Sequence, residues 1–156
     1  MAERRKLCGY GAGEYEEKRS RFIGELWPVA SEEEARARIA AVKKKYPDAR
    51  HHCWAWILPD GSFRWSDDGE PGGTAGMPVL DVILKENVTD VCVVATRYFG
   101  GTLLGAGGLV RAYSHTSKIA LNAGKIITMA QCSVLSVNVD YPFYERAVKL
   151  LEEFSA

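Results

Sequence analysis

The segment from Val91 to Tyr113, VCVVATRYFGGTLLGAGGLVRAY, constrains the fold more than any other part of the chain. It begins with an apolar, β-branched run over residues 91–95, which is typical of a strand buried on both faces. Five glycines follow between Gly100 and Gly108. From Leu109 onward the apolar residues recur at helical spacing. The segment therefore predicts a central strand joined to a long helix by a glycine-rich loop.

This glycine-rich loop allows two interpretations. Glycines let the backbone adopt positive φ angles and let a ligand approach closely, and the N–H groups at the start of the following helix attract an anion. Arg97 and Arg111 flank the loop and could donate charge-assisted hydrogen bonds to that anion. In the alternative, the loop is a tight crossover whose glycines only solve a packing problem. The sequence matches neither a P-loop nor a dinucleotide fingerprint, because no Gly-Lys-Ser/Thr closes the loop and Val110 stands where the fingerprint needs glycine or alanine.

A second glycine-rich loop, residues 66–76, is acidic and carries Asp67, Asp68 and Glu70. Three carboxylates in a short segment suit a hard metal ion or acid–base chemistry. Their spacing does not match an EF-hand loop, and the Gly-Pro-Gly surroundings equally suit a turn held by carboxylate-to-backbone hydrogen bonds. A third interpretation is that the aspartates orient the arginines of the first loop. We expect no metal and no cofactor at this loop.

The charge balance narrows the class of partner. Twenty lysines and arginines match twenty aspartates and glutamates, so no net charge draws the chain as a whole to nucleic acid or membrane. A nucleic-acid contact would therefore need a local patch. The basic residues near the N-terminus precede no apolar signal-peptide segment, and no apolar run is long enough to span a membrane. We expect a cytoplasmic protein without a membrane partner.

The cysteines and histidines do not form a recognisable metal motif. The four cysteines lie far apart, without a C-x-x-C pair, which favours reduced thiols; they are Cys8, Cys53, Cys92 and Cys132. Adjacent strand residues point to opposite faces, so at most His51 and Cys53 of the His-His-Cys run converge. His115 lies one turn after Arg111 on the same helix face, where it is either a base or phosphate contact, or an ordinary exposed histidine.

The remaining patterns predict further strands and helices around the central strand. We expect strands over about residues 20–29, 51–58, 63–66, 126–129 and 133–139, and helices over about 32–46, 77–84, 109–123 and from 142. A capping box at residues 31–34 marks the first helix, and Gly124 is expected to end the third in a left-handed conformation. Residues 1 to about 19 are predicted to be a loose lead-in, with a short strand near Leu7.

The last strand and helix indicate a second, incomplete module. A strand followed by one helix cannot bury its own apolar face. We therefore divide the chain into a first domain, residues 1–130, and residues 131–156, which look like the first half of a second small α/β domain. Either the rest of that domain was removed, or the segment leans on the first domain or on another copy.

Several motifs occur together in an order that resembles a known family. They are Ser20–Gly24, Ala49–Ala55, Ser66–Pro71 with Gly73–Gly76, Thr96–Gly101, and Leu104 to Tyr113. Together they resemble the YigZ/IMPACT family over about residues 15 to 125. One departure is Leu103, which stands where many members carry lysine and which weakens a purely electrostatic account of the loop.

The resemblance implies an α+β fold. The N-terminal domain would be like domain 2 of ribosomal protein S5, with a mixed sheet and helices on one face. It also implies that residues 131–156 are the start of a partial ferredoxin-like module, truncated in this bacterial-type member. Members of the family are regulators linked to translation, and the resemblance implies no established catalytic activity.

We therefore expect a non-enzymatic regulator that binds RNA, the ribosome or a translation factor through a surface formed by both loops. Tyr98 and Phe99 are either stacking groups for the bases of single-stranded or irregular RNA, or core residues. A small anionic ligand would suit the same surface. The residues predicted for the site are Asp67, Asp68, Glu70, Thr74, Arg97, Tyr98, Gly100, Gly101, Gly105, Gly107, Gly108 and Arg111. The alternative is an enzyme, a hydrolase or transferase acting on a small molecule or phosphate ester, that uses the same loops.

The surface exists only if the two loops lie at the same sheet edge, which requires that the preceding strands run in the same direction. If they do, we expect the three carboxylates to hold Arg97 and Arg111 in place. Replacing either arginine with alanine would then abolish binding with little loss of stability.

Overall fold

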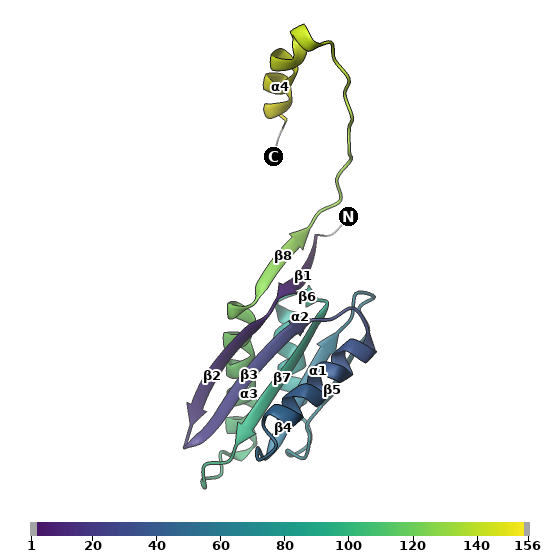
Figure 1. The fold of residues 1–156 in the computed structure, drawn as a ribbon. Helices are drawn as coiled ribbons and strands as arrows, with labels where there is room; N and C mark the ends of the chain where they lie inside the picture. Colours follow the sequence, from purple (N-terminus) through teal and green to yellow (C-terminus); the bar gives the residue numbers. More distant parts are fainter. Residues whose placement is uncertain (1–2, 155–156) are drawn as a thin grey trace.

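The structure, a computed structural model, describes residues 3–154 and is built on a five-stranded antiparallel sheet (Figure 1). The strand order is β2-β3-β7-β4-β5. The strands are β2 (Gly11–Glu17), β3 (Ser20–Pro28), β4 (His51–Ile57), β5 (Phe63–Ser66) and β7 (Val91–Tyr98). As predicted, β7 is central, and its first seven residues are buried. It extends three residues beyond the predicted strand, so Arg97 belongs to the strand and not to the loop.

Helices cover both faces of this sheet, so the prediction that helices pack on one face is wrong. Helices α2 (Gly76–Lys85) and α3 (Gly105–Ala123) pack on one face, where Val91, Val93 and Ala95 point. Helix α1 (Glu32–Lys45) packs on the other face, against Cys92 and Val94 (Figure 1). Because side chains alternate along a strand, a strand that is apolar at every position needs a cover on each side.

The first residues form two strands and not a loose lead-in. Strand β1 (Arg4–Gly9) leads directly into β2, and it forms a small mixed sheet of order β6-β1-β8 with β6 (Val88–Thr89) and β8 (Lys125–Met129). The inward positions of β2 include glycines because α3 lies too close for a side chain. A Cβ atom at Gly13 would lie 2.3 Å from a methyl carbon of Ile119. No apolar alternation therefore marks this strand in the sequence.

The ends of α3 also differ from expectation. The helix begins at Gly105, so Gly105, Gly107 and Gly108 belong to its first turn and the loop before it is only residues 99–104. At its other end, Gly124 is extended, with φ −77° and ψ 159°, and is not left-handed. A Cβ atom there would lie 2.9 Å from methyl carbons of Leu7 and Leu26, so close packing accounts for this glycine.

The C-terminal part projects away from the sheets (Figure 1). The strand predicted over residues 133–139 is wrong, because residues 130–140 have no regular secondary structure. The predicted helix is present as a short 3₁₀ turn, Tyr141–Phe143, followed by α4 (Tyr144–Glu152), which has no buried side chain. That this segment begins a ferredoxin-like domain stays a prediction. Residues 1, 2, 155 and 156 of the two predicted domains lie outside the described residues.

The strand directions bring the two glycine-rich loops to one end of the molecule. Strand β4 pairs antiparallel with both β5 and β7, so β5 and β7 run in the same direction. The loop after β5 and the loop after β7 therefore leave the sheet at the same end.

Candidate functional site

The acidic loop meets the end of β7 through a buried ion pair, so the predicted contact between Glu70 and Arg97 is confirmed. Arg97 Nη1 donates a hydrogen bond of 2.8 Å to Glu70 Oε1. The Arg97 side chain is only 6% exposed and that of Glu70 only 3%. Arg97 points to the face of the sheet that α2 and α3 cover, because it follows Val93 and Ala95 in the alternation of β7. This pair ties the acidic loop to the central strand.

Glu70 receives further polar groups from α3 and β4. The Tyr113 hydroxyl donates a hydrogen bond of 2.7 Å to the same Oε1 atom, and His51 Nε2 lies 3.6 Å from Oε2. Burial raises the pKa of the Tyr113 phenol far above its usual value, with Cys53 and Glu70 adding to the effect, so the hydroxyl stays a donor. Glu70 is thus the centre of a buried polar network.

The other acidic residues hold the loop itself together. Asp67 accepts backbone N–H hydrogen bonds at 2.9–3.1 Å; the donors are Gly73, Ala75 and Gly76. Asp68 accepts from the His52 backbone N–H at 2.8 Å and forms an ion pair with Lys43 at 3.4 Å. The prediction that these aspartates orient Arg97 and Arg111 is therefore wrong. The carboxylates point to different partners, as expected for a turn held by carboxylate-to-backbone bonds.

A cavity of about 500 Å³, which we call the loop cavity, lies where the two loops and the start of α3 meet. Its lining combines both loops with the end of β4 and with apolar residues; it consists of Arg50, His51, Gly69, Glu70, Pro71, Arg97, Phe99, Leu103, Leu104, Gly105, Ala106 and Leu109. At its rim, Phe99 is 41% exposed and Leu103 is 81% exposed. A cavity of this size can accept a small molecule or a single base.

Arg97 is held between two aromatic rings. Its guanidinium carbon lies 5.7 Å from the ring centre of Phe22 and 5.5 Å from that of Phe99. Its Nη2 atom lies 3.3 Å from Ser20 Oγ, which also accepts from the Gly100 backbone N–H at 3.3 Å. The guanidinium therefore has a fixed position under Phe99.

Gly100 lets the loop touch the β2–β3 turn. A Cβ atom at this position would lie 2.0 Å from the backbone carbon of Arg19. Only glycine fits so close an approach. The packing interpretation of the glycines is therefore correct for Gly100, whereas a Cβ atom at Gly101 would meet nothing within 4 Å.

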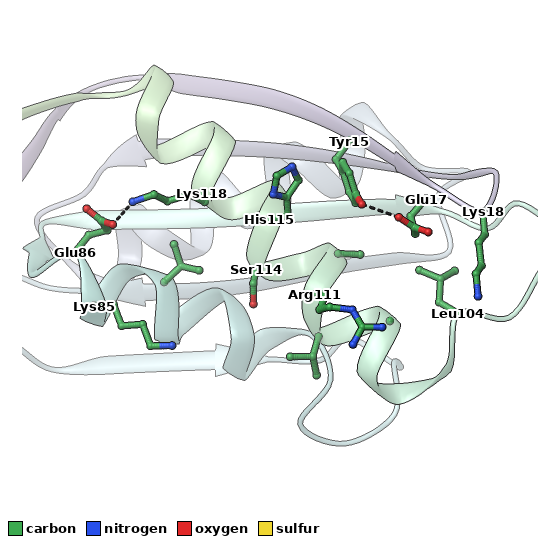
Figure 2. Close-up of a pocket in the computed structure, with 14 residues that line it drawn as sticks. Tyr15, Glu17, Lys18, Lys85, Glu86, Leu104, Arg111, Ser114, His115 and Lys118 are labelled. Carbon is green, nitrogen blue, oxygen red and sulfur yellow. Dashed lines mark hydrogen bonds and ion pairs between the residues drawn. The ribbon is translucent and has the colours of Figure 1, made fainter.

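The structure separates the residues that the sequence grouped into one site. Glu70, Arg97 and Gly105 line the loop cavity. Thr74 is buried and donates to the Pro71 carbonyl at 2.6 Å, while the Tyr98 hydroxyl donates to Asp48 at 3.0 Å. Gly108 and Arg111 line a different cavity, between α2, α3 and the end of β2 (Figure 2), and Gly107 lies beside the Arg111 guanidinium. The prediction that Arg111 joins the carboxylates of the acidic loop is therefore wrong.

The list of predicted site residues leaves out Arg50, His51 and Phe99 of the loop cavity, although Phe99 is considered above as a stacking group. Strand β4 pairs with β7 and places His51 opposite Arg97, which brings His51 and the preceding Arg50 to the same end of the sheet as Arg97. Because β4 runs antiparallel to β7, the first residues of β4 lie beside the last residues of β7. Leu103 and Ala106 carry no polar signal and become visible only in three dimensions.

Among residues 3–154, no group of three or more His, Cys, Asp or Glu side chains is placed to hold a metal ion. Burial raises the pKa of the Cys53 thiol well above its usual value, and its Sγ atom donates to the Asp67 carbonyl at 3.0 Å. Within the same residues, no helix is long and apolar enough to cross a membrane.

Fold and site together define a small α+β domain that presents two glycine-rich loops at the same end of an antiparallel sheet. The family model of the Impact N-terminal domain matches residues 18–121. This range includes both loops, the strands β5 and β7 that precede them, and most of α3. The chain belongs to the IMPACT family.

Individual relatives agree with this assignment. The chain is 39% identical over 146 residues to the IMPACT family member YvyE of Bacillus subtilis (strain 168), covering 91% of this chain and 67% of that protein. It is similar to a crystal structure of a hypothetical protein, with a TM-score of 0.78 and 34% identity over 98% of this chain and 76% of that one. It is also similar to the structure of a two-domain translational regulator, Yih1, with a TM-score of 0.50 and 31% identity over 74% of this chain and 47% of that one.

Proposed function

We propose that this chain is an RNA-binding module of translation-related regulation and that it binds RNA through the surface around the loop cavity. The observation that carries the proposal is the position of Phe99. Its ring is exposed at the rim of the cavity, and the guanidinium carbon of Arg50 lies 5.7 Å from the ring centre. Arg50 is itself exposed.

An exposed aromatic ring beside a cation suits unpaired RNA. Unstacked bases bind to aromatic faces, and the phosphates that follow need positive charge. Arg50 has no ion-pair partner among residues 3–154, so its charge is available to a phosphate. A regular duplex would not offer such a base, which is why we favour single-stranded or irregular RNA.

The buried network under Phe99 supports the proposal through preorganisation. Arg97 is held by Glu70 and Ser20 and supports the ring from below. A platform that is already ordered loses little conformational freedom when a ligand binds. In this account Arg97 positions Phe99 and does not contact the RNA.

The comparison with Yih1 supports the link to translation, since that protein is described as a translational regulator. The balanced overall charge of the chain determines how tightly we expect it to bind RNA. With only a few cations at the cavity, few counterions are released on binding, so affinity should be modest and should fall only moderately with salt.

The proposal is tested by fluorescence anisotropy with a fluorescein-labelled 12-nucleotide single-stranded RNA at low salt. Phe99→Ala should weaken binding by about fivefold or more, because stacking one base contributes about 1–3 kcal/mol. Phe63→Ala is the matched control, since Phe63 is 51% exposed but pairs with Ile57 at the opposite end of the sheet.

Two results would contradict the proposal. One is equal binding by wild type and Phe99→Ala. The other is failure to bind any RNA oligomer while the chain co-purifies with a translation factor after nuclease treatment, which would make a protein the partner.

A further inference from the structure

A second cavity, of about 660 Å³, lies between α2, α3 and the end of β2 (Figure 2); we call it the helix groove. Its lining is Tyr15, Glu17, Lys18, Val82, Lys85, Glu86, Leu104, Gly108, Val110, Arg111, Ala112, Ser114, His115 and Lys118. The volume is typical of sites for small organic molecules. Leu104 lines both cavities, but Phe99 and Arg50, which carry the proposal above, do not line the helix groove.

The helix groove combines an apolar wall with a rim of positive charge. Val82 of α2, Leu104 of the loop before α3 and Val110 of α3 supply the apolar surface. Such a wall suits the body of an organic molecule and not a bare inorganic ion.

Three cations of the groove have no carboxylate partner. Among residues 3–154, neither Lys18, Lys85 nor Arg111 takes part in any ion pair or side-chain hydrogen bond. The two carboxylates of the groove already have partners within the protein. Glu86 pairs with Lys118 and Arg5, which lowers its pKa, and Glu17 accepts from the Tyr15 hydroxyl at 2.6 Å. The groove therefore offers positive charge that the protein itself does not neutralise.

The charged side chains that line the groove carry a net charge of +2. Four cations, including Lys118, face two carboxylates. A phosphate monoester carries a charge of about −1.5 to −2 near pH 7. The excess therefore matches one phosphate monoester group.

The position of Arg111 on α3 adds a second argument. A Cβ atom at Gly107 would lie 3.3 Å from Arg111 Nη1, so the guanidinium turns back toward the N-terminal turn of the helix. That end of α3 has no acidic residue in its first turn and no side-chain cap. A cation is unfavourable beside the positive end of a helix dipole. A bound anion would relieve this repulsion and pair with Arg111 at the same time.

Ser114 supplies a neutral hydrogen-bond donor within the helix groove. In the view of Figure 2, its hydroxyl lies between the Lys85 ammonium and the Arg111 guanidinium. His115 lines the groove nearby, with its ring 4.5 Å from that of Tyr15.

We infer that the helix groove is a binding site for a small organic phosphate monoester. Arg111, Lys85 and Ser114 bind the phosphate group, and the wall of Val82, Leu104 and Val110 contacts the organic body. Lys18, which Figure 2 shows at the opposite end of the groove from Lys85, adds attraction at longer range.

The test is an amide chemical-shift titration of the whole ¹⁵N-labelled chain with adenosine 5′-monophosphate, adenosine and inorganic phosphate. The monophosphate should cause saturating shifts at Lys85, Arg111 and Ser114. Adenosine and phosphate should each bind much more weakly, since each supplies only half of the recognised chemistry.

Variants sharpen the test without endangering the fold, because the two long cations are exposed. Arg111→Gln and Lys85→Gln should each lower the affinity for the monophosphate about tenfold, the loss of one charge-assisted hydrogen bond. Lys44→Gln, on the exposed side of α1, should leave it unchanged. Phe99→Ala should also leave it unchanged, which keeps this site separable from RNA binding.

Three results would overturn the inference. They are the absence of shifts in the groove with the monophosphate, equal affinity for adenosine and its monophosphate, or undiminished binding by Arg111→Gln. Shifts in the groove with an RNA oligomer but not with the monophosphate would assign the phosphates to RNA instead.

Discussion

Arg97 and Arg111 flank the same glycine-rich segment, yet their surroundings are opposite. Arg97 lies on the central strand, is 6% exposed and pairs with a buried carboxylate. Arg111 lies on the exposed side of α3 and has no ion-pair partner among residues 3–154. The comparison teaches that an arginine beside a glycine loop does not define a ligand site. What matters is whether the protein already neutralises its charge.

The two cavities differ in the same way. In the loop cavity, polar groups are bonded to one another, and Phe99 and Arg50 are what remains open to a partner. In the helix groove, Val82 is half-buried and Val110 is exposed, and three of the four cations have no ion-pair partner among residues 3–154. We expect the first to recognise the shape and face of a base and the second to recognise charge.

The largest effect should come from breaking the buried ion pair. Arg97→Ala should destabilise the chain by about 3–5 kcal/mol, because it leaves the Glu70 carboxylate buried without its cation. Arg111→Ala is the matched control and should change the free energy of unfolding by no more than about 0.5 kcal/mol. Urea unfolding followed by tryptophan fluorescence measures both. Equal effects of the two substitutions would remove the distinction on which the comparison rests.

A smaller loss should follow from adding a methyl group where the loop meets the β2–β3 turn. Gly100→Ala should cost about 1–3 kcal/mol, because its Cβ would lie 2.0 Å from the Arg19 backbone. Gly72→Ala, whose Cβ would meet nothing within 4 Å, should be neutral or slightly stabilising. The same unfolding assay separates them. A neutral Gly100→Ala would show that the loop can move away from the turn.

The smallest effect is local opening of the acidic loop, which the Cys53 thiol reports. Burial raises the pKa of Cys53 and raises that of Cys92 to about 12, so neither should react with a thiol reagent at pH 8 in the folded wild type. The exposed Cys8 and Cys132 should react at once. In Glu70→Gln, labelling of Cys53 should accelerate while that of Cys92, on the other face, should not. Parallel acceleration of both would indicate global and not local opening.

Much of the fold could be predicted because local signals agree with tertiary contacts. The serine half of the capping box is present, since Ser31 Oγ accepts from the Glu34 N–H at 3.2 Å. The Glu34 carboxylate accepts at 2.7 Å from the N–H of Ala30, the residue before the N-cap, and not from that of Ser31. The central strand is equally evident from its run of apolar residues. In each case the residues that carry the signal are neighbours in sequence.

The failures involve partners that are distant in sequence. Strand β2 was missed because α3 forces glycine into inward positions, which removes the apolar alternation. The strand predicted over residues 133–139 has the right alternation but no neighbouring strand among the described residues. Alternation predicts a strand only where another strand supplies hydrogen bonds.

The site, like the fold, could be predicted only in part. The meeting of the loops follows from strand direction, which the pattern left open and the antiparallel pairing decides. The choice of Glu70, and not Asp67 or Asp68, as partner of Arg97 depends on three-dimensional positions 27 residues apart in sequence. Arg111 was misplaced because three more glycines belong to the helix than the apolar spacing indicated.

The most direct test of the account is to map the RNA contact on the whole ¹⁵N-labelled chain by amide chemical shifts. With the 12-nucleotide single-stranded RNA, the account predicts that the largest shifts occur at Arg50, Phe99 and Leu103, around the loop cavity. Largest shifts on α1 or within residues 130–154, with the loop cavity unaffected, would contradict it.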